Sequence, residues 1–229
     1  MYKKIRYFFY ILIYYIMSGA LSDVQLTELA KKMGFNLNGI YFQDEIKCED
    51  LRHGNYIINT SPQFDASGNQ NLGTHWVCMV VTKREGKVWI QYFDPFGIGP
   101  PENLKKIVDK RYKRRINYTT KNVQSMVSSI CGWFCVTYLH FIYQFPSRTK
   151  DILYDTAVYL DFFNDLNVVT DYKKNEFMIK LMMQEKGKAF KGLEDVFKDE
   201  TLEDIYDNRI TDGDKDDIKG NIEDIQIRE

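Results

Sequence analysis

One cysteine of this sequence stands where a reactive thiol is expected. From Cys131 onward, fifteen residues carry no charge (His taken as neutral) and no proline, and bulky apolar side chains fall on every face. This pattern predicts a helix that is buried on all sides and begins at Cys131. Unpaired N–H groups and the positive dipole end of a helix N-terminus favour a thiolate over a thiol. Cys131 is therefore a candidate nucleophile, and Ser125, Ser128 and Ser129 offer caps for its helix.

A thiol nucleophile also needs a base, a group that orients the base, and donors for an oxyanion. Without them, Cys131 is better interpreted as a small buried apolar residue, as most free cysteines are. The chain has three histidines. His140 lies roughly 13 Å along the predicted helix from Cys131, at ~1.5 Å per residue, so we interpret it as a core histidine. His53 lies in a polar, turn-like stretch, which favours a surface position.

His75 is the histidine that the pattern places near a carboxylate. It lies in an apolar run of strand composition over 73–81, and a second such run covers 88–94. The five-residue polar link between them contains a glycine, which predicts an antiparallel hairpin. Pairing around that link places His75 opposite roughly Asp94, close enough for a carboxylate to fix the tautomer of an imidazole. Alone, Asp94 would be interpreted as a turn residue at a strand end that Pro95 terminates.

Four motifs follow one another in this chain: Gly73-Thr74-His75-Trp76, Tyr92-Phe93-Asp94-Pro95-Phe96-Gly97, Gln124, and Cys131-Gly132-Trp133-Phe134-Cys135. In this order, with the glutamine seven residues before the cysteine, the sequence resembles the adenovirus endopeptidase (adenain) family. That family belongs with the ubiquitin-like-protein-specific proteases, and related sequences occur in virophages and Maverick/Polinton elements. The resemblance runs from about Ser18 through the predicted helix and weakens after Pro146.

The resemblance implies a role for each of four residues. Cys131 is implied as the nucleophile, His75 as the general base and Asp94 as its orienter. Gln124 is implied as an oxyanion-hole donor beside the Cys131 backbone N–H. Adenovirus enzymes have glutamate at the position of Asp94, whereas ubiquitin-like-protein proteases have aspartate, and either carboxylate serves this role. In papain-like enzymes the nucleophile precedes the histidine, so the order found here resembles a circular rearrangement of that site.

These residues require a scaffold, and the fold we expect is α+β. A mixed central β-sheet carries the strands of His75 and Asp94 and packs against the buried helix that starts at Cys131. With 229 residues and 44% hydrophobic side chains, the chain can bury one good core. Four further elements are predicted: an amphipathic helix over 22–34, a strand over 56–59, and helices at about 148–164 and 172–186, with Met178, Leu181, Met182 and Met183 in the core. A polar loop over 60–71 is expected to form one wall of a substrate cleft.

The chain divides into an N-terminal extension (1–17), a cysteine protease domain (18–191) and an acidic tail (192–229). Fifteen uncharged residues over 7–21 follow a basic head. This is short of the ~20 residues of a spanning helix but fits a signal-peptide core. Because the family-like region begins almost directly after Met17, we favour translation from Met17, with membrane tethering through residues 7–21 as the functional alternative.

A basic segment follows the predicted hairpin. Pro100-Pro101-Glu102 predicts the start of a helix, and seven of the next residues form what we call the basic patch: Lys105, Lys106, Lys110, Arg111, Lys113, Arg114 and Arg115. One interpretation is a solvated helix face, and the other is a contact for nucleic acid or an acidic partner. The resemblance favours the second, because adenovirus protease is stimulated by DNA. That enzyme is also activated by a peptide joined through a cysteine in this neighbourhood, where this chain has arginine and no thiol.

The tail over 192–229 has the opposite charge, with fourteen acidic and five basic residues. No stretch of it could bury a core, which predicts partial disorder. Such a tail either solvates the protein or folds back on the basic patch and competes there with nucleic acid. The four cysteines have neither CxxC nor zinc-ligand spacing, which argues against a disulfide framework and a metal site and indicates a reducing compartment.

Two classes of function are consistent with these patterns. The first is a thiol endopeptidase, which the resemblance makes a viral maturation protease that cleaves capsid or other structural precursors after small residues, at Gly-Gly or Gly-X sites. It would act in the infected cell cytoplasm, in a viral factory or in the virion, and it would need no cofactor beyond stimulation by DNA or an activating peptide. Removal of ubiquitin-like modifiers is the alternative activity. The second class is a non-catalytic assembly module on the same fold, which would have no reason to keep Cys131, His75, Asp94 and Gln124 together.

Overall fold

The computed structural model of this protein describes residues 20–71, 73–144, 152–163 and 171–184. The N-terminal extension over 1–17 and the acidic tail over 192–229 lie outside the described residues, so the predictions made for them stay predictions. In the part of the chain that is described, no helix has the length and apolar character needed to cross a membrane.

A mixed five-stranded sheet forms the centre of the fold, as predicted. Its strands lie in chain order: β1 (Gly39–Phe42), β2 (Gly54–Asn59), β3 (Trp76–Arg84), β4 (Lys87–Phe93) and β5 (Asn117–Tyr118). β2, β3 and β4 pair antiparallel, while β1 joins β2 and β5 joins β4 in parallel. The two edge strands were not predicted. Both are short and only half-buried, so neither shows the alternation of a longer strand.

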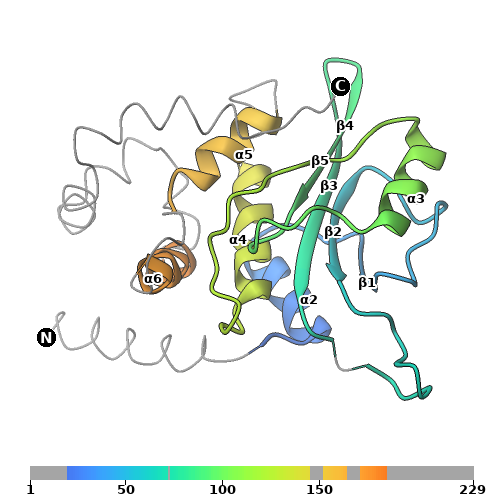
Figure 1. The fold of residues 1–229 in the computed structure, drawn as a ribbon. Helices are drawn as coiled ribbons and strands as arrows, with labels where there is room; N and C mark the ends of the chain where they lie inside the picture. The colour runs from blue at the N-terminus through green and yellow to red at the C-terminus, as the bar shows by residue number, and fades with distance from the viewer. Residues whose placement is uncertain (1–19, 72, 145–151, 164–170, 185–229) are drawn as a thin grey trace, which may run out of the picture.

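Helices cover both faces of the sheet (Figure 1). One apolar cluster joins Cys78 and Val80 of β3 to helices α2 (Asp23–Lys32), α4 (Cys131–Gln144), α5 (Ile152–Leu160) and α6 (Asp171–Gln184). A second cluster joins the alternate β3 residues, Val77 and Met79, to helix α3 (Glu102–Tyr112). Successive strand side chains point to opposite faces, so β3 contributes to both clusters.

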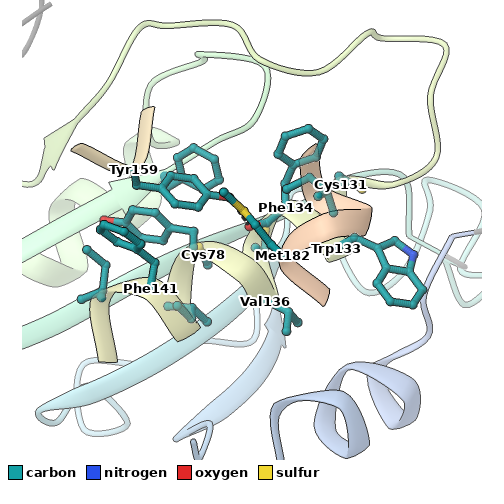
Figure 2. Close-up of a cluster of buried hydrophobic side chains, with 14 of the residues drawn as sticks. Cys78, Cys131, Trp133, Phe134, Val136, Phe141, Tyr159 and Met182 are labelled. Carbon is teal, nitrogen blue, oxygen red and sulfur yellow. Dashed lines mark hydrogen bonds between the residues drawn. The ribbon is translucent and has the colours of Figure 1, made fainter. Parts of the chain in front are cut away.

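Helix α4 is buried along almost its whole length, as predicted. Every residue from Cys131 to Ile142 is buried, and α5 and α6 pack around it (Figure 2). The Thr137 hydroxyl in this core is satisfied, because it bonds to that of Tyr159 at 2.8 Å and to backbone carbonyls of its own helix. On α6, Met178 and Met182 are buried and Leu181 and Met183 half-buried in the same cluster, which confirms their assignment to the core.

Helix α2 confirms the predicted helix over 22–34 and helps to place the start of α4. The Ser22 hydroxyl accepts from the Gln25 N–H at 3.2 Å, and the Gln25 side chain accepts from the Ser22 N–H at 2.9 Å, which is a complete capping box. The helix buries Leu26 and Ala30 in the cluster around α4. A Cβ added to Gly132, in the first turn of α4, would lie 3.1 Å from Leu26, so the glycine permits this close approach.

The hairpin formed by β3 and β4 is tighter than predicted. Arg84 pairs with Lys87, so the turn contains only Glu85 and Gly86, both with positive φ (49° and 79°). The prediction of a five-residue link was wrong, because charged side chains continue both strands beyond the buried part of the sheet. The register pairs Cys78 with Phe93, two positions away from the predicted pairing.

Candidate active site

His75 and Asp94 lie together at the open end of the hairpin, one residue outside their strands. The His75 Nε2 and Asp94 Oδ1 atoms are 2.7 Å apart, and both side chains are buried. The contact between His75 and Asp94 was predicted, although the predicted register of β3 and β4 was wrong. Continued by three residues, the observed register puts His75 opposite Phe96, and these two rings stack at a centroid distance of 4.0 Å. Asp94 reaches the imidazole from the neighbouring turn.

The turn after β4 fixes the Asp94 carboxylate. Asp94 Oδ1 accepts from the Phe96 N–H at 2.8 Å, and the Asp94 carbonyl accepts from the Gly97 N–H at 2.9 Å. Gly97 has φ 68°, and an added Cβ would lie 2.3 Å from the carbonyl oxygen of Thr120. Only glycine meets both conditions without displacing the backbone. The sharp turn predicted at Asp94-Pro95-Phe96-Gly97 is therefore present and holds the carboxylate against the imidazole.

Cys131 begins helix α4, as predicted, and its thiol contacts the strand that follows His75. The Trp76 N–H donates to Cys131 Sγ at 3.3 Å, and the Cys135 thiol donates to the Trp76 carbonyl at 3.3 Å. The predicted serine caps are wrong: Ile130 precedes the helix, and its carbonyl accepts from the N–H groups of the first turn. The Ser125 and Ser128 hydroxyls bond elsewhere, to the Val127 N–H and the Glu176 carboxylate.

The charge state of His75 reflects both neighbours. Burial opposes a charged imidazole, but the hydrogen bond and negative charge of Asp94, together with the neighbouring Cys131 thiol, outweigh it and raise the pKa of His75 from 6.5 to about 9. Nε2 bonds to Asp94, while Nδ1 is buried without a hydrogen-bond partner among the described residues. Nδ1 is therefore the ring nitrogen that can exchange a proton with the thiol.

The other two histidines lie as predicted. His140 is buried in α4, with its ring tilted against that of Phe35 at 6.3 Å, and burial lowers the pKa of His140 to about 4. It is therefore neutral at pH 7. His53 is exposed beside the start of β2.

Gln124 is buried in the segment between the Asp94 turn and α4. The backbone N–H groups of Val123 and Gln124 donate to the Pro95 carbonyl at 2.9 and 3.1 Å, which ties this segment to the residue after Asp94. The Gln124 amide nitrogen donates to the Ser128 carbonyl at 2.8 Å. That bond uses one of the two amide hydrogens. The predicted role of Gln124 in an oxyanion hole stays a prediction.

No family model matches the chain. A protease of human adenovirus B serotype 3 is 30% identical to it over 127 residues, which are 49% of this chain and 53% of the relative. A protease of bovine adenovirus B serotype 3 is 26% identical over 128 residues, covering 49% of this chain and 55% of the relative. The resemblance to the adenovirus endopeptidases is confirmed.

The chain spans about half the length of the curated relatives it matches. Among solved structures, an ASFV protease overlaps 72% of this chain and 68% of its own at 17% identity and a TM-score of 0.37. That score is too low to support an argument, so the family resemblance depends on the sequence matches and the motifs.

The basic patch lies away from the site. All seven of its basic residues are exposed, but α3 ends at Tyr112 and Lys113 adopts a left-handed conformation with φ 53°. Lys113, Arg114 and Arg115 therefore follow the helix, which corrects the prediction that one helix face carries the whole patch. α3 packs on the sheet face opposite α4 (Figure 1), so the patch and Cys131 lie on different sides of the sheet.

Two residues near the site were missed by sequence reasoning. Phe96 stacks on His75. Its place two residues after Asp94 could have indicated this contact. Asn59 is buried at the end of β2, and its side-chain oxygen accepts from the N–H groups of Ser61 and Thr74 at 3.0 and 3.3 Å. It thus joins the two ends of the loop over 60–71, although no sequence pattern marks it. The expectation that this loop walls a cleft stays a prediction.

Proposed function

We propose that this chain is a cysteine protease in which Cys131, His75 and Asp94 act as nucleophile, general base and orienter. One observation carries the proposal: the buried His75 imidazole bonds to Asp94 at 2.7 Å and interacts with the thiol that begins helix α4, and these partners raise the pKa of His75 to about 9. An imidazole that stays protonated at neutral pH beside a thiol favours the thiolate–imidazolium pair of a thiol protease.

The geometry supports the following mechanism. Asp94 holds the Nε2–H of His75, so Nδ1 takes the proton of the Cys131 thiol. The thiolate attacks the carbonyl carbon of the scissile peptide bond. The Cys131 N–H at the start of α4 and the Gln124 amide donate to the resulting oxyanion. The imidazolium then protonates the leaving amine, and a water activated by His75 hydrolyses the thioester to release the acid and restore the thiol.

The relatives are proteases of adenoviruses, which supports a viral protein as the substrate. We propose viral structural precursors, capsid proteins among them, cut after small residues at Gly-Gly or Gly-X sites in the cytoplasm, viral factory or virion. A ubiquitin-like modifier is the second candidate substrate, favoured by the aspartate at position 94. DNA or an activating peptide is the candidate stimulator, and the seven exposed residues of the basic patch are the candidate contact for DNA or an acidic partner.

A cleavage profile on a peptide library tests the proposal. We expect the protein to cut a subset of peptides with glycine before the scissile bond, and the Cys131→Ala variant to cut none. The Cys48→Ala variant is the matched control, because Cys48 is also a free thiol but lies outside the cluster around α4. Absence of cleavage by the unaltered protein, with folding intact, would favour the assembly module instead.

A further inference from the structure

The segment from Val123 to Ile130 carries Gln124 but has little apolar packing of its own. Val123 and Ile130 are buried at its two ends, whereas Met126 is 75% and Val127 92% exposed. A segment with an exposed apolar tip depends on polar contacts for its shape. One of these contacts holds the Gln124 side chain itself, whose amide donates to the Ser128 carbonyl.

Helix α6 supplies two of these contacts, one on each side of Gln124. The buried Asn175 side chain donates to the Val123 carbonyl at 2.9 Å. The Ser128 hydroxyl donates to Glu176 Oε1 at 2.6 Å, and the Ser128 carbonyl accepts from the Gln124 amide at 2.8 Å. A chain of bonds therefore runs from Glu176 through Ser128 to the side chain of Gln124.

Helix α6 also packs on the domain through an apolar face. The helix buries Met178, Ile179 and Met182 in the cluster around α4, and this apolar face holds it on the domain. Asn175 and Glu176 instead reach the Val123–Ile130 segment through its backbone and one hydroxyl. The apolar face of α6 packs in the cluster around α4, and the side chains of Asn175 and Glu176 hold the Val123–Ile130 segment by hydrogen bonds.

We propose that Asn175 and Glu176 are positioning residues for the oxyanion hole, which hold the Val123–Ile130 segment so that Gln124 can donate to the oxyanion formed at Cys131. The inference rests on the proposed function. Small displacements of such a donor are costly, because the stabilisation requires a donor that is already in place when charge develops. α6 would then be part of the catalytic apparatus although it lies outside the motifs that carry the family resemblance.

The test compares two probes of the same thiol. Iodoacetamide alkylates Cys131 and needs only the thiolate. A peptide aldehyde ending in Gly-Gly adds to the Cys131 sulfur; its C=O π bond breaks and its oxygen, as an oxyanion or protonated by His75, occupies the oxyanion hole. We expect Glu176→Ala to lower kcat on a fluorogenic Gly-Gly peptide and the aldehyde affinity by about 10- to 100-fold, with KM, iodoacetamide labelling and Tm unchanged.

Three variants sharpen the test. Glu176→Gln keeps an acceptor for the Ser128 hydroxyl and should restore most of the activity. Ser128→Ala should match Glu176→Ala, and the double variant should be no worse than either, because all remove one bond. Both side chains are only partly buried, so these variants are expected to fold. Lys173→Ala, exposed on the same helix, is the control.

Two results would overturn the inference: unaltered kcat and aldehyde affinity in Glu176→Ala, or a parallel fall of kcat, labelling and Tm, which would indicate a structural role only. Failure of the proposed function is a different result. In that case the unaltered protein would neither bind the aldehyde nor cleave the peptide.

Discussion

The two buried histidines of this protein differ in charge at neutral pH: His75, beside the β3–β4 hairpin, is protonated, whereas His140, in helix α4, is neutral. Burial lowers the pKa of both imidazoles, and for His140 it prevails and brings the pKa to about 4. For His75, Asp94 and Cys131 overcome the burial and the pKa rises to about 9. The comparison shows that a buried histidine becomes an acid–base group through its ionised neighbours, and that burial by itself makes it a neutral core residue.

The largest effect on turnover is expected from substituting Cys131, the thiol next to His75. Cys131→Ala should abolish both turnover and labelling of the native protein by iodoacetamide, because the paired thiolate is the reactive species. Labelling is read by mass spectrometry of the intact protein. The Cys48→Ala variant should keep both properties, and comparable labelling of the Cys131→Ala protein would refute the assignment.

Substituting each histidine separately should show that only His75 takes part in catalysis. His75→Ala should lower kcat by about 10²- to 10⁴-fold, the usual contribution of a general base. His140→Phe should stay within a few-fold, because His140 lies in the core of α4 and takes no part in the proposed mechanism. Single-turnover assays on the Gly-Gly peptide measure both. If the two variants lost activity equally, the contrast between the two sites would be wrong.

Asp94→Asn should change the pKa of His75 and leave the pKa of His140 unchanged. The variant keeps the geometry but removes the charge that holds the imidazolium, so the pKa of His75 should fall well below about 9 while that of His140 stays at about 4. NMR titration of the imidazole C–H protons reports each value. Turnover should drop less than in His75→Ala, because only tautomer control and charge are lost. An unmoved His75 titration would remove Asp94 from the pair.

The free energy of unfolding should fall as the pH moves away from neutrality in either direction. His75 causes the fall at alkaline pH, and His140 causes the fall at acid pH. The folded pKa of His75 lies above its ordinary 6.5, so its contribution is complete below that pH and is lost as pH rises to about 9. The folded pKa of His140 lies below 6.5, so stability is lost as pH falls from 6.5 towards about 4. Urea unfolding at several pH values checks this. His140→Phe should flatten the acid side only, and His75→Ala the alkaline side only.

The smallest effect on the site is expected from the basic patch, on the opposite face of the sheet. Lys106→Glu combined with Arg111→Glu should weaken DNA binding and reduce the slope of log affinity against log salt by about 2, because two phosphate contacts are lost. Fluorescence anisotropy with a short duplex measures this. Iodoacetamide labelling of Cys131 should not change. An equal salt slope in both proteins would leave the patch as a solvated surface.

The sequence predicted the parts of this site that are local or strongly periodic. Helix α4 was predicted because its apolar residues cover every face. The contact of His75 with Asp94 was predicted because His75 lies near the start of one apolar run and Asp94 at the end of the other, in one hairpin. The register of β3 and β4 was predicted wrongly. The charged residues at the ends of these strands were interpreted as part of the link, although they continue the strands. The contact survived this error because the turn after β4 brings Asp94 back towards His75.

Other contacts between distant segments could not be predicted from the sequence. β1 and β5 are parallel edge strands of four and two residues, which carry too few side chains to show a period. The bonds of α6 to the Val123–Ile130 segment join residues 48 and 52 positions apart through one hydroxyl and one carbonyl. Asn175 and Glu176 resemble any other polar residues of an amphipathic helix, so only their placement in the fold distinguishes them.

The two-residue turn at Glu85 and Gly86 also has a consequence for the order in which the protein folds. It closes a short loop, so pairing of β3 with β4 costs little chain entropy, and His75 and Asp94 are only 19 residues apart. Trp76 and Cys131 are separated by 55 residues, and their contact must wait until α4 docks on the sheet. We expect the histidine–carboxylate pair to assemble early and the thiol to join it late. The newly made chain would therefore acquire its reactive cysteine only after the core has closed.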